Sequence, residues 1–237
     1  QFWPDSKNLV ARQVDGWLKD QRPISTQAIA AESVAVKGFP AMEYLLFDEK
    51  ALASPRACEL LQAISAQVSL NATSLAEQWA AFKPHYLAES VYDVTTISAA
   101  THALEILRDA RLAAPMGLQG KKRRNPYLAD AWRSGQSLTA MKASLEGLQR
   151  DFLPGFATLM HAQEDDELLQ QFEQALAASL ARLQPLPADM TASLDNDQGY
   201  RDLQLLFVDI DRLTTLLDGP IASELGIIKG FNSSDGD

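Results

Sequence analysis

The sequence predicts an all-α protein of antiparallel helical bundles in two lobes. Apolar residues recur at spacings of three and four over most of the chain, which is the period of helices with one buried face. No run of strict alternation between apolar and polar residues is bounded by turn residues, so no strand is predicted. Prolines and glycines divide the helical pattern into segments.

The first helices are short and end at turn residues. Residues 5–20 form an amphipathic helix, and residues 25–36 form a second one. Gly38 stops the second helix, and Pro40 starts a third because its fixed φ suits a first helical turn.

A long helical hairpin is predicted next. Ser54-Pro55 is a helix start signal, and the apolar pattern continues to Phe82, on the order of 40 Å of helix. A helix of this length needs a neighbour of similar length, and residues 86–112 supply the pattern for one. Lys83-Pro84 would then be the short turn of an antiparallel pair.

The region 113–125 contains two glycines, a proline and a basic run, so it is the predicted internal boundary. We expect an N-terminal lobe over residues 1–118, lacking its first helices, and a C-terminal lobe over residues 119–237. The second lobe is predicted to hold four helices and an irregular tail: residues 126–132, 137–152, 165–183 and 200–217, followed by residues 230–237.

Composition excludes several classes of protein. Acidic residues outnumber basic ones 31 to 21, giving a formal net charge of −10, so a nucleic acid partner is not expected. The one basic run, Lys121 to Arg124, is interpreted as a solvated loop that can attract an anionic surface. No stretch approaches the roughly 20 apolar residues of a membrane span. The single cysteine, Cys58, rules out an internal disulfide and is expected to be a buried structural thiol.

Glu43 is the strongest candidate for a functional residue. Near the end of a first helical turn its carboxylate would favour the helix end, which is a purely structural explanation. Apolar neighbours, Phe39 and residues 44–46 among them, favour burial, and a buried carboxylate needs a partner such as a metal or a polar ligand. The residues alone leave both explanations open.

Two further groups are weaker candidates. Arg133 and Ser134, beside Trp132, can bind a carboxylate, although the residues alone favour an exposed arginine at a helix C-terminus. Asp209, in Asp209-Ile210-Asp211-Arg212, either faces inward or pairs with Arg212 on the surface.

The general enzyme motifs are absent from the sequence: it has no HExxH, GxSxG, Walker or dinucleotide pattern. The three histidines, His85, His102 and His161, lie on separate segments and form no metal-binding pair in sequence.

Four stretches of the chain resemble the imelysin-like family. The segment from Gly38 to Phe47 resembles its GxHxxE region, with proline in place of the histidine. The other three are Phe2-Trp3-Pro4-Asp5, residues 125–138 with Ala131-Trp132-Arg133-Ser134-Gly135, and the ending from Leu225 to Asp237. The resemblance implies an all-helical bacterial protein of two bundle-like lobes, exported to the periplasm or held on a membrane as a lipoprotein, and implicated in iron uptake.

The resemblance also suggests which residues form the site. Glu43 matches the family's glutamate, and Gly38 would be the residue that lets another backbone come close. Arg133 and Ser134 would be polar groups that face the same cleft. The histidine position is Pro40, which has no side-chain donor or acceptor for a metal, so a metallopeptidase loses a ligand here. Family members are longer at the N-terminus, and the chain starts at Gln1 without a methionine or leader, so a processed or truncated product with a lipid anchor in the missing part is expected.

Three functions follow as hypotheses. The first is a protein of iron uptake, without catalysis, that binds a metal such as iron, a metal complex or another iron-uptake protein near Glu43. The second is a metallopeptidase, which would need a histidine within coordination distance of Glu43. The third is a structural adaptor in which Glu43 only stabilises its helix.

Overall fold

The computed structural model describes residues 5, 7–92, 94–119 and 123–227. Over these ranges the chain forms helices, turns and irregular connections without a strand, which confirms the all-α prediction. None of the helices within them is both long and apolar enough to cross a membrane. The predictions made for Phe2-Trp3-Pro4, for Lys121 and Lys122, and for the tail from residue 228 onward lie outside the described residues.

The chain divides into two compact units that interleave in sequence. The first unit comprises residues 1–88 and 127–136, and the second comprises residues 89–126 and 137–237. The sequence assigned residues 89–118 to the first lobe, whereas this division places them in the second unit. The difference has a physical reason, because the proline- and glycine-containing stretch near residue 118 links helices that pack in the same unit.

The first unit is built around one apolar cluster. Val14 and Trp17 of α1 pack with residues of the next helices, including Tyr44 and Leu45 of α3. The long helix α5 contributes Leu60 and Ile64 near its start. The helices of this unit are α1 (Leu9–Lys19), α2 (Thr26–Ala30), α3 (Phe39–Phe47), α4 (Glu49–Leu52) and α5 (Ala57–Ala88).

Helix α5 differs from the predicted hairpin in two ways. It continues through Pro84, which lies one turn before its end, so the one helical hydrogen bond that is lost is that to the carbonyl of Ala80. Its second half is uncovered, since Leu75 is 70% exposed and Trp79 46% exposed. The expected antiparallel partner begins only at Thr95 and belongs to the second unit. The apolar spacing therefore predicted the helix correctly and its partner incorrectly.

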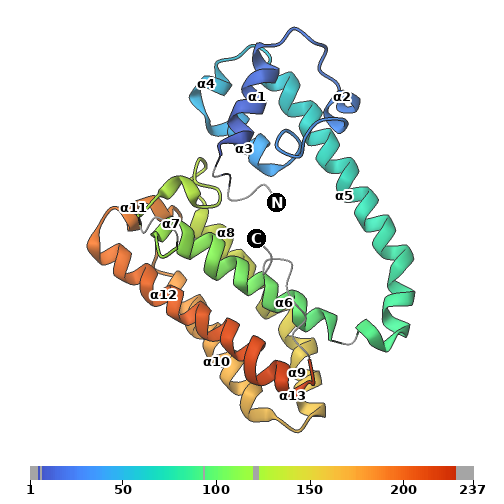
Figure 1. Ribbon diagram of the computed structural model, residues 1–237, viewed down its shortest axis with the longest axis vertical. Coiled ribbons are helices and arrows are strands. Elements are labelled where there is room, and N and C mark those ends of the chain that lie inside the picture. Colours follow the sequence, from blue (N-terminus) through green and yellow to red (C-terminus); the bar gives the residue numbers. More distant parts are fainter. Residues whose placement is uncertain (1–4, 6, 93, 120–122, 228–237) are drawn as a thin grey trace. The chain divides into compact units, whose positions relative to one another are not determined.

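The second unit is a bundle in which α12 packs against α10 and α6, and α10 packs against α8 (Figure 1). Asp165 caps α10 by accepting a hydrogen bond from the Leu168 amide at 3.0 Å, so the helix begins where the sequence predicted one. Its helical segments are η1 (Ser90–Tyr92), α6 (Thr95–Glu105), η2 (Ile106–Ala113), α7 (Ala114–Met116), α8 (Ser137–Gly147), η4 (Leu148–Phe152), α9 (Leu153–Ala162), α10 (Asp166–Leu183), α11 (Met190–Leu194), α12 (Asp197–Leu216), η5 (Leu217–Ile221) and α13 (Ala222–Glu224); η3 (Pro126–Leu128) spans the junction of the two units.

Three segments of the second unit, η2, η4 and η5, are π-helical, and each lies at a proline. Pro115 and Pro154 follow η2 and η4 within two residues, and Pro220 lies inside η5. A proline lacks the amide hydrogen and its ring clashes with the carbonyl four residues earlier, so a wider turn relieves both problems. The helical path therefore continues through Pro154 and Pro220, where the sequence predicted breaks.

Candidate functional site

Glu43 accepts two hydrogen bonds from Ser134, a residue 91 positions further along the chain. The Ser134 amide lies 2.9 Å from Glu43 Oε1, and the Ser134 hydroxyl lies 2.8 Å from the same oxygen. Helix α3 begins at Phe39, so Glu43 is its fifth residue and lies outside the first turn. The explanation by the helix dipole is therefore wrong, and the contact with Ser134 takes its place.

Residues 127–136 reach Glu43 through a compact turn. Ala131 adopts a left-handed conformation with φ of 50°, which is uncommon for a residue with a side chain. The Ala131 carbonyl accepts hydrogen bonds from the Ser134 hydroxyl at 3.1 Å and from the Gln136 amide at 3.0 Å. Gly135 follows with φ of 66°. These bonds hold Ser134 in the position from which it contacts Glu43, and the predicted helix through Trp132 is replaced by this turn.

Arg133 lies beside two aromatic rings of the first unit. Its guanidinium carbon is 4.3 Å from the ring centroid of Trp132 and 4.9 Å from that of Tyr44. The Trp132 ring in turn contacts Tyr127 edge-on at 4.8 Å. Arg133 Nε is buried and has no hydrogen-bond partner among the described residues. The guanidinium is thus held by cation–π contacts while part of its donor capacity stays unused.

An open groove of about 380 Å³ adjoins this arginine, and all of its lining residues belong to the first unit. Arg133 and Lys50 contribute positive charge, and Trp132 contributes an aromatic wall. Asp48 also lines the groove, but its carboxylate accepts hydrogen bonds from the amides of Lys50 and Ala51 and so caps α4. Phe47 and Glu49 complete the lining. The lining thus holds two basic and two acidic side chains, and Arg133 and Lys50 are its groups for contact with an anionic ligand.

Tyr44 links this corner to α1. Its hydroxyl donates a hydrogen bond to Asp15 Oδ1 at 2.7 Å, and its ring faces Arg133. Burial raises the pKa of the Tyr44 phenol, and the hydrogen bond to Asp15 with the nearby negative charges raises it further. The phenol therefore stays protonated in the folded protein above the ordinary tyrosine pKa of about 10.

This pKa shift predicts a pH dependence of stability. Because the folded-state pKa is raised, the contribution of Tyr44 is fully present below about pH 10 and is lost as pH rises toward the folded-state value. Urea unfolding of Tyr44→Phe and of the unmodified protein, followed between pH 8 and pH 11, measures the effect. We expect the unmodified protein to lose stability more steeply above pH 10 than the variant; equal slopes would contradict this assignment.

Two residues of the predicted corner have lesser roles. Gly38 is the N-cap of α3 in an extended conformation, and a Cβ there would meet only Pro40 Cδ at 3.6 Å. The close approach expected of Gly38 is therefore not required. Pro40 lies at the exposed start of α3, as its fixed φ predicted, and Phe39 is 73% exposed, so the expected burial around Glu43 comes from Tyr44 and Leu45.

The other predicted candidates form structural contacts elsewhere. Asp209 pairs with Arg182 of α10 and not with Arg212, so it faces inward. Asp211 lies 3.2 Å from Arg108. Cys58 is exposed, because the buried face of α5 turns Leu60 and Ala57 inward instead, so the prediction of a buried thiol is wrong.

The basic run is only partly a solvated loop. Arg124 stacks on the Tyr200 ring at 3.7 Å and donates to the Leu194 carbonyl at 3.0 Å.

No histidine joins Glu43 in a metal-binding group. Across the described ranges, no set of three or more histidine, cysteine, aspartate or glutamate side chains is placed to hold a metal ion. His102 lies 3.4 Å from Glu105, and His161 lies 2.6 Å from Asp166. A histidine grouped with Glu43 in a metal site, which would have favoured the metallopeptidase hypothesis, is therefore not found among the described residues.

Three residues of the site were not singled out from the sequence. Tyr44 and Lys50 reach it from α3 and α4, and Asp15 reaches it from α1. Their only signal in the sequence was proximity to Glu43 or a place on the polar side of a helix, which many residues share. Trp132 was noted only as the neighbour of Arg133.

Comparisons with known proteins support a common origin for this architecture. The family model described as Imelysin (Peptidase_M75) matches residues 1–217. A crystal structure of an imelysin-like protein from Psychrobacter arcticum is similar to this chain with a TM-score of 0.85 at 20% sequence identity, covering 98% of this chain and 72% of that one. A search of curated proteins finds no match. The chain therefore belongs to the imelysin family.

Proposed function

We propose that this protein is an exported component of bacterial iron uptake that binds an anionic metal complex, without catalysing a reaction. The cargo is a ferric ion already chelated by a polycarboxylate, and the binding site is the groove beside Arg133. The proposal includes export, to the periplasm or to a membrane as a lipoprotein, because the resemblance to imelysin-like proteins implies it. The metal arrives as cargo and is not a resident cofactor.

The observation that carries the proposal is the placement of Arg133. Its guanidinium is held between Trp132 and Tyr44, next to Lys50 in the groove, and its Nε is buried without a partner. Arginine binds carboxylates in a bidentate manner with a planar set of donors, so a chelate with free carboxylate oxygens suits it.

The arrangement supports a chelate better than a bare ion. Glu43 Oε1 accepts both donors of Ser134, and no set of three metal-binding side chains is found among the described residues. A chelated ferric ion already has its oxygen ligands, so the protein needs to supply only counter-charge and shape.

Calorimetric titration with ferric citrate, and separately with citrate alone, tests the proposal. We expect saturable binding of ferric citrate that Arg133→Gln weakens at least about tenfold, the loss of one charge-assisted contact. Arg133→Lys keeps the charge but loses the planar donor set, so it should restore binding only in part. The control is Arg150→Gln, which removes an exposed arginine of the second unit. Absence of binding, or binding that Arg133→Gln leaves unchanged, would refute this site.

A further inference from the structure

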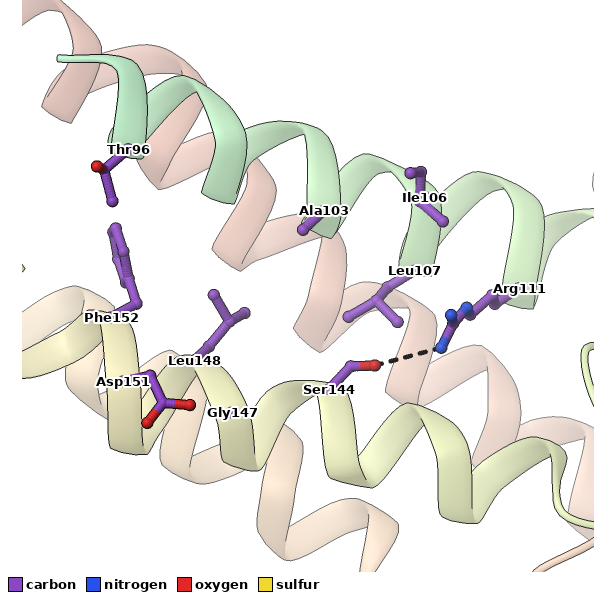
Figure 2. A pocket seen from close by; sticks show the side chains of 10 residues that line it. All are labelled: Thr96, Ala103, Ile106, Leu107, Arg111, Ser144, Gly147, Leu148, Asp151 and Phe152. Carbon is purple, nitrogen blue, oxygen red and sulfur yellow. Dashed lines mark hydrogen bonds between the residues drawn. The ribbon is translucent and has the colours of Figure 1, made fainter. Parts of the chain in front are cut away.

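A second pocket, of about 510 Å³, lies wholly within the second unit. It opens between α6 with η2 on one side and α8 with η4 on the other (Figure 2). Its volume falls within the usual range of small-molecule sites, roughly 300–1,000 Å³. None of its lining residues takes part in the groove beside Arg133.

The two π-helical segments give this pocket its walls. Ile106 and Leu107 come from η2, and Leu148 and Phe152 come from η4. A π-helical turn is wider than an α-helical one and changes the direction in which the following side chains point. Their position next to Pro115 and Pro154 explains why these segments are wide.

The polar groups of the pocket are separated from one another. Figure 2 shows Arg111 and Ser144 together at one end, where the guanidinium donates to the Ser144 hydroxyl at 3.2 Å. Asp151 lies at the other end, and its carboxylate is paired with Arg150 by two hydrogen bonds of 2.8 and 2.5 Å. Leu107 and Leu148 lie between the two ends, and the Phe152 ring lies at the same end as Asp151.

We infer that this pocket binds an aliphatic carboxylate, with its anionic head at Arg111 and its chain along the apolar walls. A guanidinium recognises a carboxylate by charge-assisted hydrogen bonds. The Ser144 hydroxyl, which donates to the Ala140 carbonyl at 3.1 Å and accepts from Arg111, holds the guanidinium in place. The apolar walls, closed at the far end by the Phe152 ring, suit a hydrocarbon chain that leaves water. Arg111 brings the positive charge that attracts an anionic head. Asp151, at the opposite end, is paired with Arg150.

Gly147 allows the pocket to be filled by substitution. It lines the pocket, adopts a helical conformation with φ of −62°, and an added Cβ would have no heavy atom within 4 Å. Gly147→Leu therefore adds a side chain to a residue that lines the pocket, starting from a Cβ that meets no neighbour, and leucine is the better helix former. We expect this variant to fold at least as stably as the unmodified protein.

Titration calorimetry with octanoate and with 1-octanol on the full chain tests the inference. We expect octanoate to bind more tightly than the neutral alcohol. Gly147→Leu should abolish binding of both, with thermal unfolding showing that the variant is folded. Arg111→Gln should weaken octanoate about tenfold and leave octanol unchanged within about twofold. The matched control is Arg201→Gln, which removes an exposed arginine of α12 outside the pocket and should bind octanoate as the unmodified protein does.

Several outcomes would overturn the inference. No binding of octanoate, or binding that persists in Gly147→Leu, would exclude the pocket as the site. Equal affinity for octanoate and octanol, with no effect of Arg111→Gln, would exclude an anionic head. A protein that cosediments with phosphatidylglycerol vesicles through Arg111 but does not bind octanoate would assign the same chemistry to membrane lipid and not to a free carboxylate.

Discussion

Replacement of Glu43 by alanine is expected to lower the free energy of unfolding of the first unit by about 2–4 kcal/mol. The substitution leaves the Ser134 amide without its acceptor and leaves the Ser134 hydroxyl only the Ala131 carbonyl at 3.1 Å. Each lost bond was charge-assisted and worth roughly 1.5–3 kcal/mol. The loss is smaller than the sum because the site is only partly buried and water replaces some of the contacts.

Urea unfolding followed by tryptophan fluorescence measures this effect, because Trp17, Trp79 and Trp132 all belong to the first unit. Ser134→Ala is the comparison variant, since it removes the hydroxyl bond and keeps the amide bond. We expect it to cost about half as much, roughly 1–2 kcal/mol. If Glu43→Ala were no more destabilising than an exposed substitution, the contact would not hold residues 127–136 in place.

Phe172→Ala is expected to destabilise the second unit by about 3–5 kcal/mol, the usual cost of removing a buried aromatic side chain. Phe172 is fully buried in α10, and its ring contacts Phe156 at 5.1 Å and Phe152 at 6.1 Å in edge-on geometry. The substitution leaves a cavity that the surrounding helices fill only in part.

Far-UV circular dichroism during urea unfolding measures this loss, since the helices of both units contribute to the signal. Val208→Ala is the control in the same unit, because Val208 is 61% exposed and its truncation should change stability by less than about 0.5 kcal/mol. Since the tryptophans report on the first unit, we expect the ellipticity transition to shift more than the fluorescence transition. A Phe172→Ala protein as stable as Val208→Ala would contradict the packing described for α10.

Local sequence patterns predicted the longer helices well, whereas the helix expected over residues 25–36 is limited to Thr26–Ala30 and the one expected over residues 126–132 is mostly a turn. The buried face of α12, with Leu203, Leu206, Ile210 and Leu213, follows directly from spacings of three and four. The start of α10 follows from Asp165 and the acidic first turn. These features depend on residues near one another in the chain, which is why one sequence suffices to find them.

Features that depend on distant residues were not predicted. Nothing local to Glu43 indicates that its partner is Ser134, 91 residues away, although each was separately a candidate. The uncovered half of α5 has the same apolar spacing as a buried helix, so the sequence cannot show that its expected neighbour packs elsewhere. Prolines were interpreted as breaks because π-helical turns, which accommodate them, have no sequence signal of their own.

The most direct test of the account is the affinity of Glu43→Gln for ferric citrate. Glu43 does not line the groove, but its contact with Ser134 positions the neighbouring Arg133. Glutamine keeps the acceptor oxygen but turns both charge-assisted bonds from Ser134 into weaker neutral ones, so we expect a folded protein whose affinity falls, by less than the tenfold loss in Arg133→Gln. If Glu43→Gln bound ferric citrate with the affinity of the unmodified protein while Arg133→Gln bound it more weakly, Glu43 would have no part in binding and would only stabilise the fold.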